Sequence, residues 1–375
     1  MPTRLRSIAD AIESWAPPQS AQSYDNVGLQ VGRADAEIRR AVVALDMTPQ
    51  VLDEARRRDA QLIVTHHPLL FRPLKRLTPD SLVSSLALSL AESGIALYAA
   101  HTNLDAARGG VSFALAGQLG LENVEFLQGM DGQVVKLVTF VPPEHAGAVR
   151  TALGEAGAGR IGRYDHCAFT APGTGHYRPG EGTDPYAGES GGDIESADEI
   201  RIEAEVARWD LPAVLSALRE RHPYEEPAYD VIPVDQPYRD AGIGAVGDLP
   251  NESSLGDFLR HVCTVLENPA LRYAGEPAAR IRRVAVCGGS GSSFLSAARS
   301  AGADVFVTAD VTYHTYFDVL NTDGTPRMAL VDAGHYETER ITETLLTDWL
   351  SERFPDVDWI RTDVRTAPVA TFVPD

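Results

Sequence analysis

Short apolar runs alternate with amphipathic segments through the first 130 residues of the chain. The runs are rich in β-branched residues, which is typical of buried strands, and the segments between them repeat apolar side chains with the period of a helix. We predict strands at residues 41–45, 62–65 and 95–100, and helices at residues 6–15, 49–58, 80–93 and 110–118. Strands that take turns with helices form βαβ units and a mainly parallel sheet.

The alternation is interrupted at about Gln133 and resumes after Pro237. Within the interruption we predict strands at residues 134–141, 164–170, 199–206 and 228–234 and helices at 144–156 and 211–221. This β-α-β-β-α-β order is that of a ferredoxin-like module. A long loop rich in Gly, Pro, Asp and Ser, residues 172–197, joins its two central strands, and loops of that length are commonly functional or mobile.

The predicted fold class is therefore α/β. Residues 1–130 and 238–375 form a discontinuous three-layer α/β domain, and residues 131–237 form an inserted ferredoxin-like α+β domain. In the second part of the α/β domain we predict strands at residues 284–287, 305–308, 328–331 and 359–364, again separated by helices.

Composition excludes some classes of partner. The 375 residues carry a formal net charge of −20, and 44% of them are hydrophobic, as in an ordinary soluble globular protein. Because binding a nucleic-acid backbone requires clustered Lys and Arg, this charge argues against nucleic acid as a partner. Three widely spaced cysteines indicate a reducing compartment, and no apolar run has the length of a signal peptide or a bilayer span. We expect a cytoplasmic protein with no membrane partner.

Three predicted strands end at residues that can bind metal ions, and in open parallel sheets sites form at the carboxyl ends of strands. Each piece also has a structural alternative. A histidine pair can belong to the core, an Asp after a strand can cap a turn, and acids at a helix start can simply favour its N-terminus. Three such strand ends together predict a common metal site, with the candidate ligands His66, His67, Asp105, His335 and Glu339.

This set contains three imidazoles and two carboxylates but no thiolate, which suits Zn, Fe, Mn or Co. Five protein ligands exceed the usual number for one catalytic ion, so two ions bridged by a carboxylate fit better. Such a pair would acidify a water between them near neutral pH. His101 and His314 are candidates for orienting ligands or transferring protons, and the alternative for each is a capping or packing role.

Other motifs are less specific. Residues 287–293, Cys-Gly-Gly-Ser-Gly-Ser-Ser, join a strand to a helix and could hold a phosphate on free backbone N–H groups. Without the Lys of a P-loop, a plain tight turn is favoured. In the insertion, residues 164–167, 173–176 and 222–226 could form a lid over a pocket or, more simply, turns and a subunit contact.

Five motifs together resemble the Nif-three-like dinuclear metal centre family, whose members are often labelled GTP cyclohydrolase 1 type 2 homologues. They are DNVGLQVG at 25–32, THHPLLF at 65–71, HTNLD at 101–105, GADVFVTADVTYH at 302–314 and DAGHYETE at 332–339. The insertion is similar to that of the longer bacterial members. The resemblance implies a toroidal homohexamer with a two-metal site in each subunit, and it places the same five residues as ligands, with Glu339 as the bridge.

Three functions remain open at this point. The first is a metal-dependent hydrolase that uses a metal-activated water on a nucleotide-like substrate, in one version attacking C8 of the guanine of GTP with His101 or His314 moving protons. The second is a metal-storage protein or metallochaperone, with the ions as cargo. The third is a ring-shaped protein-interaction scaffold. Kinship of fold does not choose among them.

Overall fold

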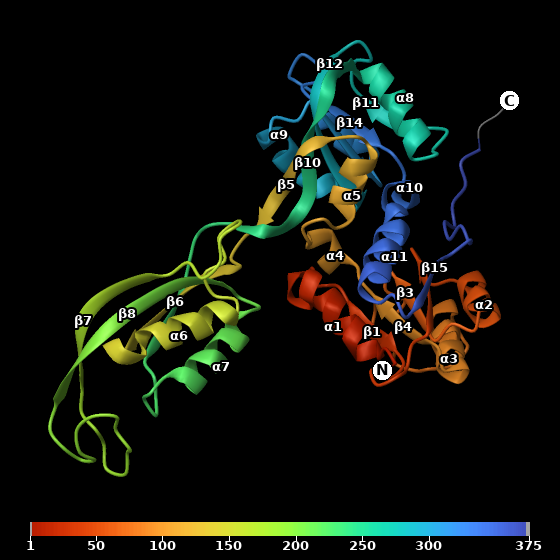
Figure 1. The fold of residues 1–375 in the computed structure, drawn as a ribbon. Helices are drawn as coiled ribbons and strands as arrows, with labels where there is room; N and C mark the ends of the chain where they lie inside the picture. Colours follow the sequence, from red (N-terminus) through yellow and green to blue (C-terminus); the bar gives the residue numbers. More distant parts are fainter. Residues whose placement is uncertain (1, 373–375) are drawn as a thin grey trace. The chain divides into compact units, whose positions relative to one another are not determined.

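The structure is a computed structural model that describes residues 2–372, and the chain folds as two compact units (Figure 1). One unit combines Met1–Gln128 with Ala241–Asp375, and the other is Gly129–Asp240. The sequence pattern placed these divisions after residues 130 and 237. The larger unit is therefore built from two segments of chain that the smaller unit separates in sequence.

The first sheet of the larger unit has the strand order β1-β4-β3-β2-β15. Strands β2, β3, β4 and β15 are parallel, and β1 pairs antiparallel with β4. Every residue of β3 is buried, as expected of a central strand covered on both faces. The bounds are Gly28–Val31 for β1, Arg40–Ala44 for β2, Leu62–Thr65 for β3, Ala96–Ala99 for β4 and Asp358–Arg361 for β15.

The second sheet has the order β11-β14-β13-β12-β10-β5, in which β12, β13 and β14 are parallel and β10 and β11 are antiparallel to their neighbours. The sequence pattern predicted the three parallel strands but missed β5, β10 and β11. The unit therefore contains two mixed sheets where a mainly parallel sheet was predicted. The bounds are Glu122–Met130 for β5, Tyr238–Ser254 for β10, Arg272–Ala274 for β11, Arg280–Ser290 for β12, Val305–Ala309 for β13 and Ala329–Asp332 for β14.

Helices cover the faces of these sheets (Figure 1). In α1 the side chains of Leu5, Ile8 and Ile12 are buried on one stripe, which follows the helical period. Thr48 and Ser81 are the N-cap residues of α2 and α3, and the hydroxyl group of each accepts a hydrogen bond from a backbone N–H in the first turn of its helix. The bounds are Leu5–Trp15 for α1, Pro49–Arg57 for α2, Leu82–Ser93 for α3, Thr102–Ala106 for α4, Val111–Gln118 for α5, Leu255–Val265 for α8, Leu295–Ser300 for α9, His335–Glu339 for α10 and Ile341–Arg353 for α11, with 3-10 turns η1 at Pro18–Ser20, η2 at Ser292–Phe294 and η3 at Tyr313–Phe317.

The smaller unit has one antiparallel sheet of order β7-β8-β6-β9. Its elements follow the predicted β-α-β-β-α-β order, namely β6 (Val134–Val141), α6 (Pro143–Glu155), β7 (Phe169–Tyr177), β8 (Glu195–Ala207), α7 (Leu211–Arg221) and β9 (Tyr229–Pro233). The prediction of a strand at 164–170 was wrong, because β7 begins at Phe169 and pairs with β8 as far as Tyr177. Cross-strand pairing overrides the low strand propensity of Gly173 and Gly175. The connecting loop is therefore residues 178–194.

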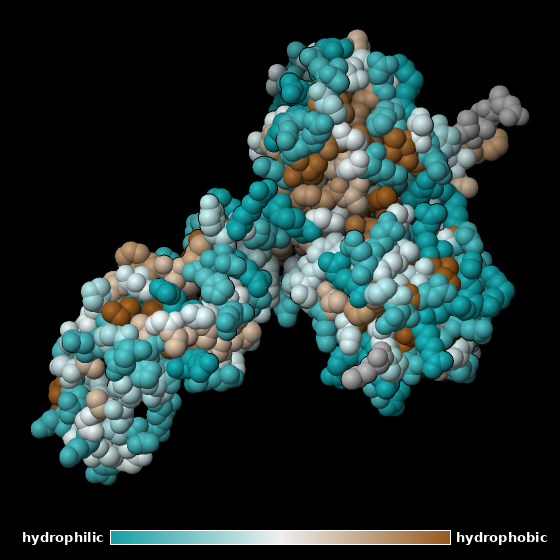
Figure 2. Space-filling model, viewed as in Figure 1, coloured by the Kyte–Doolittle hydropathy of each residue, from teal (hydrophilic) through white to brown (hydrophobic). Residues whose placement is uncertain are grey.

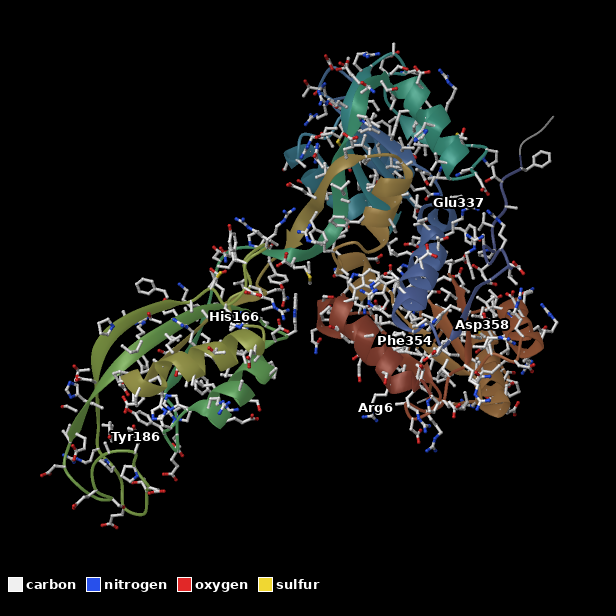
Figure 3. The ribbon with its side chains drawn as sticks, in the orientation of Figure 1. Arg6, His166, Tyr186, Glu337, Phe354 and Asp358 are labelled. Atoms are coloured by element: carbon white, nitrogen blue, oxygen red, sulfur yellow. The ribbon has the colours of Figure 1, made fainter. Side chains whose placement is uncertain are left out.

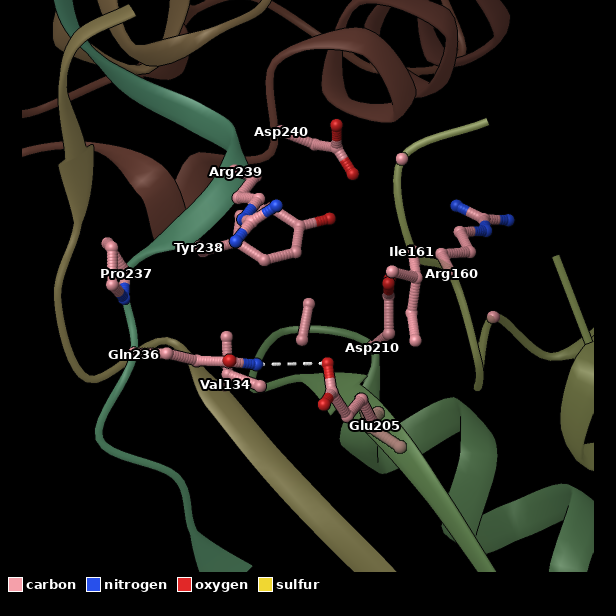
Figure 4. A pocket seen from close by; sticks show the side chains of 14 residues that line it. Val134, Arg160, Ile161, Glu205, Asp210, Gln236, Pro237, Tyr238, Arg239 and Asp240 are labelled. Carbon is pink, nitrogen blue, oxygen red and sulfur yellow. Dashed lines mark hydrogen bonds between the residues drawn. The ribbon is translucent and has the colours of Figure 1, made fainter. Parts of the chain in front are cut away.

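A cavity of about 150 Å³ lies within the smaller unit (Figure 4). Across it the side-chain amide of Gln236 donates to Oε2 of Glu205 at 3.0 Å. Burial raises the pKa of Asp210, and the charge of Arg160 acts against this shift. Its lining includes neither histidine nor cysteine, so it offers no nitrogen or sulfur ligands for a metal ion.

The face drawn in Figure 2 is mostly hydrophilic, with hydrophobic residues in small groups, in keeping with the acidic composition. Within residues 2–372, no helix is both long and apolar enough to cross a bilayer. The side chains of Cys167, Cys263 and Cys287 are free.

Candidate metal centre

The carboxyl ends of strands from both sheets of the larger unit bring histidines and acids together. His66 and His67 directly follow β3, and His101 follows β4. Asp105 lies on the short helix α4 immediately after His101, and α10 begins soon after the end of β14. Parallel strands of one sheet end at the same edge, and the contacts of Glu339 with His66 and His67 bring the edges of the two sheets together.

Glu339 lies at the centre of the cluster. Its Oε2 is 2.9 Å from Nε2 of His67 and 3.0 Å from Nε2 of His335. Its Oε1 is 3.9 Å from Nε2 of His66, which in turn is 3.7 Å from Oδ1 of Asp105. The structure thus brings all five sequence-predicted ligands together around one carboxylate.

Two groups of donor atoms have spacings suited to a metal ion. His67, His335 and Glu339 form one group, and His66, His67 and His101 form the other, with the donor atoms of each group within 4.8 Å of one another. His67 is common to both groups. The cluster could therefore hold metal ions at two adjoining positions, and His101 belongs to it as closely as the predicted ligands do.

Each imidazole is oriented by an oxygen on its Nδ1 side. Nδ1 of His67 is 2.7 Å from Asp46, that of His101 is 2.9 Å from Asp25, and that of His335 is 2.6 Å from Asp310. For His66 the partner is the backbone carbonyl of Ala100 at 2.8 Å. A hydrogen bond at one ring nitrogen fixes the tautomer and directs the other nitrogen to a metal. This arrangement is the usual support of histidine ligands.

Sequence reasoning missed Asp46 and Asp310 as partners of the histidines. Asp46 comes two residues after β2, and Asp310 comes directly after β13, where its φ of 54° is in the left-handed region. Their positions at the carboxyl ends of two further parallel strands were the available signal. The same reasoning that selected His66 and His101 would therefore have found them.

The motif at residues 25–32 supports the cluster from the edge of the first sheet. Asp25 accepts hydrogen bonds from the backbone and hydroxyl of Thr102 besides contacting His101. The side chain of Asn26 donates to the carbonyl of Leu70, and the side chain of Gln30 accepts from the Leu70 amide. The loop after His67 is thereby fixed to β1. The motif thus holds two loops of the site in place.

Glu339 and its neighbours strongly shift the proton equilibria of the site. Burial lowers the pKa of His67, but hydrogen bonds to Asp46 and Glu339 outweigh it and raise the pKa to about 10. The hydrogen bond to Glu339 raises the pKa of His335 to about 9. Burial raises the pKa of Asp105 to about 7. Burial also disfavours the charged form of Glu339, yet the three histidines hold its pKa well below the usual value. Glu339 therefore stays negatively charged at the centre of the cluster.

Two observations fit a metal at this position. Among the described residues, Nε2 of His66 is fully buried and has no hydrogen-bond partner, although a buried polar atom normally has one. Gly289, at φ +59°, lies beside Glu339, and a Cβ there would come within 2.1 Å of Oε1 of Glu339 and 3.1 Å of Nε2 of His335. The space beside the ligand atoms is therefore kept clear by a glycine.

Two amides of the glycine-rich turn after Cys287 are engaged by threonine hydroxyl groups. The N–H of Gly289 donates to the hydroxyl of Thr338, and the N–H of Gly291 donates to the hydroxyl of Thr308. This favours the tight-turn interpretation over a phosphate cradle. The turn instead allows β12 to pass close to Glu339.

His314 is exposed in the 3-10 turn η3, and its ring contacts are with Tyr313 and Phe317. None of these residues belongs to the cluster, so within the described structure His314 is not brought to the site. The Tyr-Asp-His-Cys and His-Pro-Tyr-Glu-Glu segments of the insertion lie in the other unit.

A cavity of about 580 Å³ borders the cluster, and both His67 and His335 line it. Its other walls include Asn268, Arg272 and Tyr336, together with residues 367–369 and 371 near the C-terminus. Figure 3 labels Glu337, which also lines this cavity and pairs with Arg365 at 2.7 Å. A small molecule that enters this cavity therefore meets the histidines directly.

Comparison with known proteins gives the family. The model of the family described as Duf34/NIF3 (NGG1p interacting factor 3) matches residues 3–368. The chain belongs to the Duf34/NIF3 family. Two relatives named GTP cyclohydrolase 1 type 2 homolog are each 38% identical to it. The one from Halalkalibacterium halodurans aligns over 98% of both chains, and the one from Bacillus subtilis over 90% of both.

Solved structures agree with this assignment. The Bacillus cereus protein related to NIF3 is 37% identical, with a TM-score of 0.84 over 99% of this chain and 100% of the other. A Staphylococcus aureus protein is 28% identical, with a TM-score of 0.78 over 99% of both chains. The Duf34/NIF3 fold is thus a mixed α/β fold with three sheets.

Proposed function

We propose that this Duf34/NIF3 protein is a metal-dependent hydrolase with two divalent ions per chain, Zn, Fe, Mn or Co. Its ligands are His66, His67, Asp105, His335 and Glu339. The observation that carries the proposal is the convergence of these side chains around Glu339, with an unpartnered buried nitrogen on His66 and an oriented Nδ1 on each histidine.

When bound, a pair of divalent ions polarises a substrate oxygen and lowers the pKa of water. The side chains of the chain then have distinct tasks. Glu339 contacts His67 and His335 of one donor group through Oε2 and lies 3.9 Å from His66 of the other through Oε1, which suits it to bridge them. His101, held at Nδ1 by Asp25, has a donor atom within 4.8 Å of those of His66 and His67, where it can accept or return a proton. Residues of the neighbouring cavity bind the rest of the substrate.

The cavity supports a nucleotide-like substrate. Its volume of about 580 Å³ is in the range of small-molecule sites. Tyr336 offers an aromatic face. The guanidinium of Arg272 is paired with Asp332, and Asp46, Asp310 and Glu337 add further carboxylates, so bound metal ions would have to neutralise the phosphates of such a substrate. The name carried by the relatives, GTP cyclohydrolase 1 type 2 homolog, is consistent with this class. The proposed reaction is hydrolysis of a C–N or phosphate-ester bond.

The decisive experiment compares Glu339→Gln with Glu337→Gln. Both residues lie on α10, but Glu337 pairs with Arg365 rather than with the histidines. We expect Glu339→Gln to lose at least one metal equivalent and all hydrolysis of a panel of nucleotides and phosphoesters. Glu337→Gln should keep its metal. Unchanged metal content in Glu339→Gln, measured by elemental analysis, would contradict the bridging role.

A metallochaperone is the second candidate, because the two donor groups differ in exposure. The side chain of His335 is 39% exposed, whereas that of His66 is fully buried. An ion held by His335 could therefore exchange more readily. A chaperone would release this ion quickly to a chelator and hydrolyse nothing in the panel, whereas the hydrolase keeps both ions during turnover.

We further propose that residues 1–130 and 238–375 form a discontinuous three-layer α/β domain and that residues 131–237 form an inserted ferredoxin-like domain. The β-α-β-β-α-β order of the insertion supports this description. The homohexameric ring implied by the family resemblance stays a prediction, which light scattering of the purified protein measures directly.

A further inference from the structure

A second cavity lies entirely within the smaller unit, in residues that the metal centre does not use. It has a volume of about 360 Å³ and is bounded by the end of β7, the loop 178–194, β8 and the segment after α7. Figure 3 labels Tyr186, one of its walls, among the loops of this unit. The two unassigned sequence motifs of the insertion, around His176 and around Tyr224, both line it.

Three tyrosine rings form its aromatic wall. The ring centroid of Tyr224 is 6.3 Å from that of Tyr177 and 5.7 Å from that of Tyr186, and the planes are inclined by 50° and 46°. These rings are neither stacked nor perpendicular, so they present inclined faces around a shared space. Such an arrangement of aromatic faces is the way in which proteins recognise alkylated ammonium groups.

The three phenol groups all donate hydrogen bonds away from the ring faces. Tyr224 donates to Glu199 at 2.9 Å, Tyr186 donates to Glu144 at 2.7 Å, and Tyr177 donates to the carbonyl of Ala187 at 2.8 Å. Donation to a carboxylate increases the electron density of a phenol, which strengthens the attraction of its face for a cation. The hydrogen bonds also fix the rings in place before any ligand binds.

Backbone contacts hold the loop over the cavity. The amide of Asp184 donates to Oε2 of Glu225, which joins the loop 178–194 to the segment after α7. Glu199 lies over Gly175, where a Cβ would come within 2.2 Å of its carboxylate. The carboxylate of Glu199 can therefore lie against β7 only because residue 175 is a glycine.

The charge of the lining favours a cation. Asp184, Glu199, Glu225 and Glu226 contribute carboxylates, and Arg178 is the one opposing guanidinium among the described lining residues. Burial lowers the pKa of the neighbouring His222, which therefore adds no positive charge at neutral pH. In residues 2–372, groups of His, Cys, Asp and Glu with metal-ligand spacing occur only in the other unit. An anion is disfavoured, and an inorganic metal ion lacks its ligands.

We propose that this cavity binds a small organic cation with an alkylated ammonium group, held between Tyr177, Tyr186 and Tyr224 and neutralised by Glu199. The site is independent of the metal centre and of its proposed activity. A volume of about 360 Å³ suits a ligand of a few carbon atoms, since small-molecule sites begin near 300 Å³.

Calorimetric titration of the full-length protein with choline tests the proposal, with 3,3-dimethylbutan-1-ol as the uncharged molecule of the same shape. We expect one saturable choline site per chain and binding of the alcohol that is at least about tenfold weaker, because only the charge differs. Equal binding of the two molecules, or no saturable choline site, overturns the proposal.

Variants locate the site. Tyr186→Leu and Tyr224→Leu should each weaken choline binding about tenfold or more. Circular dichroism will show whether each variant folds. Because the side chain of Tyr186 is 46% exposed, Tyr186→Leu should fold even if Tyr224→Leu does not, and the test then rests on Tyr186→Leu. The matched control is Tyr164→Leu, an exposed tyrosine of the same unit outside the cavity. A control that weakens binding as much as Tyr186→Leu contradicts the assignment.

Discussion

Replacing Gly289 with alanine should separate the geometry of the metal site from the stability of the fold. Gly289 has a φ of +59°, and an added Cβ would lie 2.1 Å from Oε1 of Glu339. Real Cβ contacts essentially never fall below 3.0 Å, so the carboxylate must retreat by roughly 1 Å, whereas ligand distances at metal sites hold within about 0.2 Å. A displacement of this size at a reacting group lowers the rate about 100-fold. We expect a loss of the same order in metal affinity when a binding group is displaced.

We therefore expect Gly289→Ala to bind Zn or Mn at least about 100-fold more weakly than wild type, which corresponds to about 2.7 kcal/mol. The matched control is Gly94→Ala. Gly94 has a φ of +67° at the end of α3, and an added Cβ there meets nothing within 4 Å. Both substitutions carry the left-handed backbone cost of about 1–2 kcal/mol, but only one of them reaches the site.

Competition with a fluorescent chelator measures metal affinity, and urea unfolding of the metal-free variants measures stability. Both variants should lose similar stability, and Gly94→Ala should keep wild-type metal affinity. If Gly289→Ala is destabilised like the control but binds metal within about threefold of wild type, the carboxylate of Glu339 is not a ligand and our assignment is refuted.

Four further predictions test the assignment of the metal centre. Asp46→Asn should weaken metal binding about 10–100-fold, because Asp46 orients His67 at 2.7 Å, and the same competition assay checks this. Metal affinity should fall as the pH falls below about 9–10. The pKa values of about 10 for His67 and about 9 for His335 mean that protons occupy these ligands in the metal-free protein and compete with the metal. The protons released when metal is added in weak buffer measure this competition. The raised pKa values also mean that the metal-free fold is most stable below the unfolded His pKa of about 6.5 and loses stability as the pH rises through 9–10, which urea unfolding at several pH values will show. His314→Ala should leave metal content unchanged by elemental analysis, because this side chain is exposed and contacts only its own turn.

Much of the candidate site could be predicted because its ligands follow strongly patterned strands. The run Leu62–Thr65 is apolar and β-branched, and the structure places β3 at the same residues. The position of the histidine pair at a strand end could therefore be predicted from the sequence. His335 and Glu339 were spaced as i and i+4, which fixed their shared face once α10 formed.

The parts that sequence reasoning missed depend on partners elsewhere in the chain. Strand β10 contains several glycines and acids, so its own residues do not favour a strand, and pairing with β12 determines it. Likewise β7 extends to Tyr177 because β8 pairs along its whole length. The positions of Asp46 and Asp310 after parallel strands could have marked them as site residues, but the histidine that each contacts is determined only when two strands lie side by side.

The two halves of the metal site are also made at very different times. His67 and Glu339 are 272 residues apart, and the whole smaller unit is synthesised between them. During synthesis the paired histidines are therefore made long before α10, and a growing chain exposes them without the acid that joins them. Metal loading by all five proposed ligands must therefore follow the synthesis of α10, and truncation before His335 would abolish it while leaving β1 to β4 of the first sheet in place.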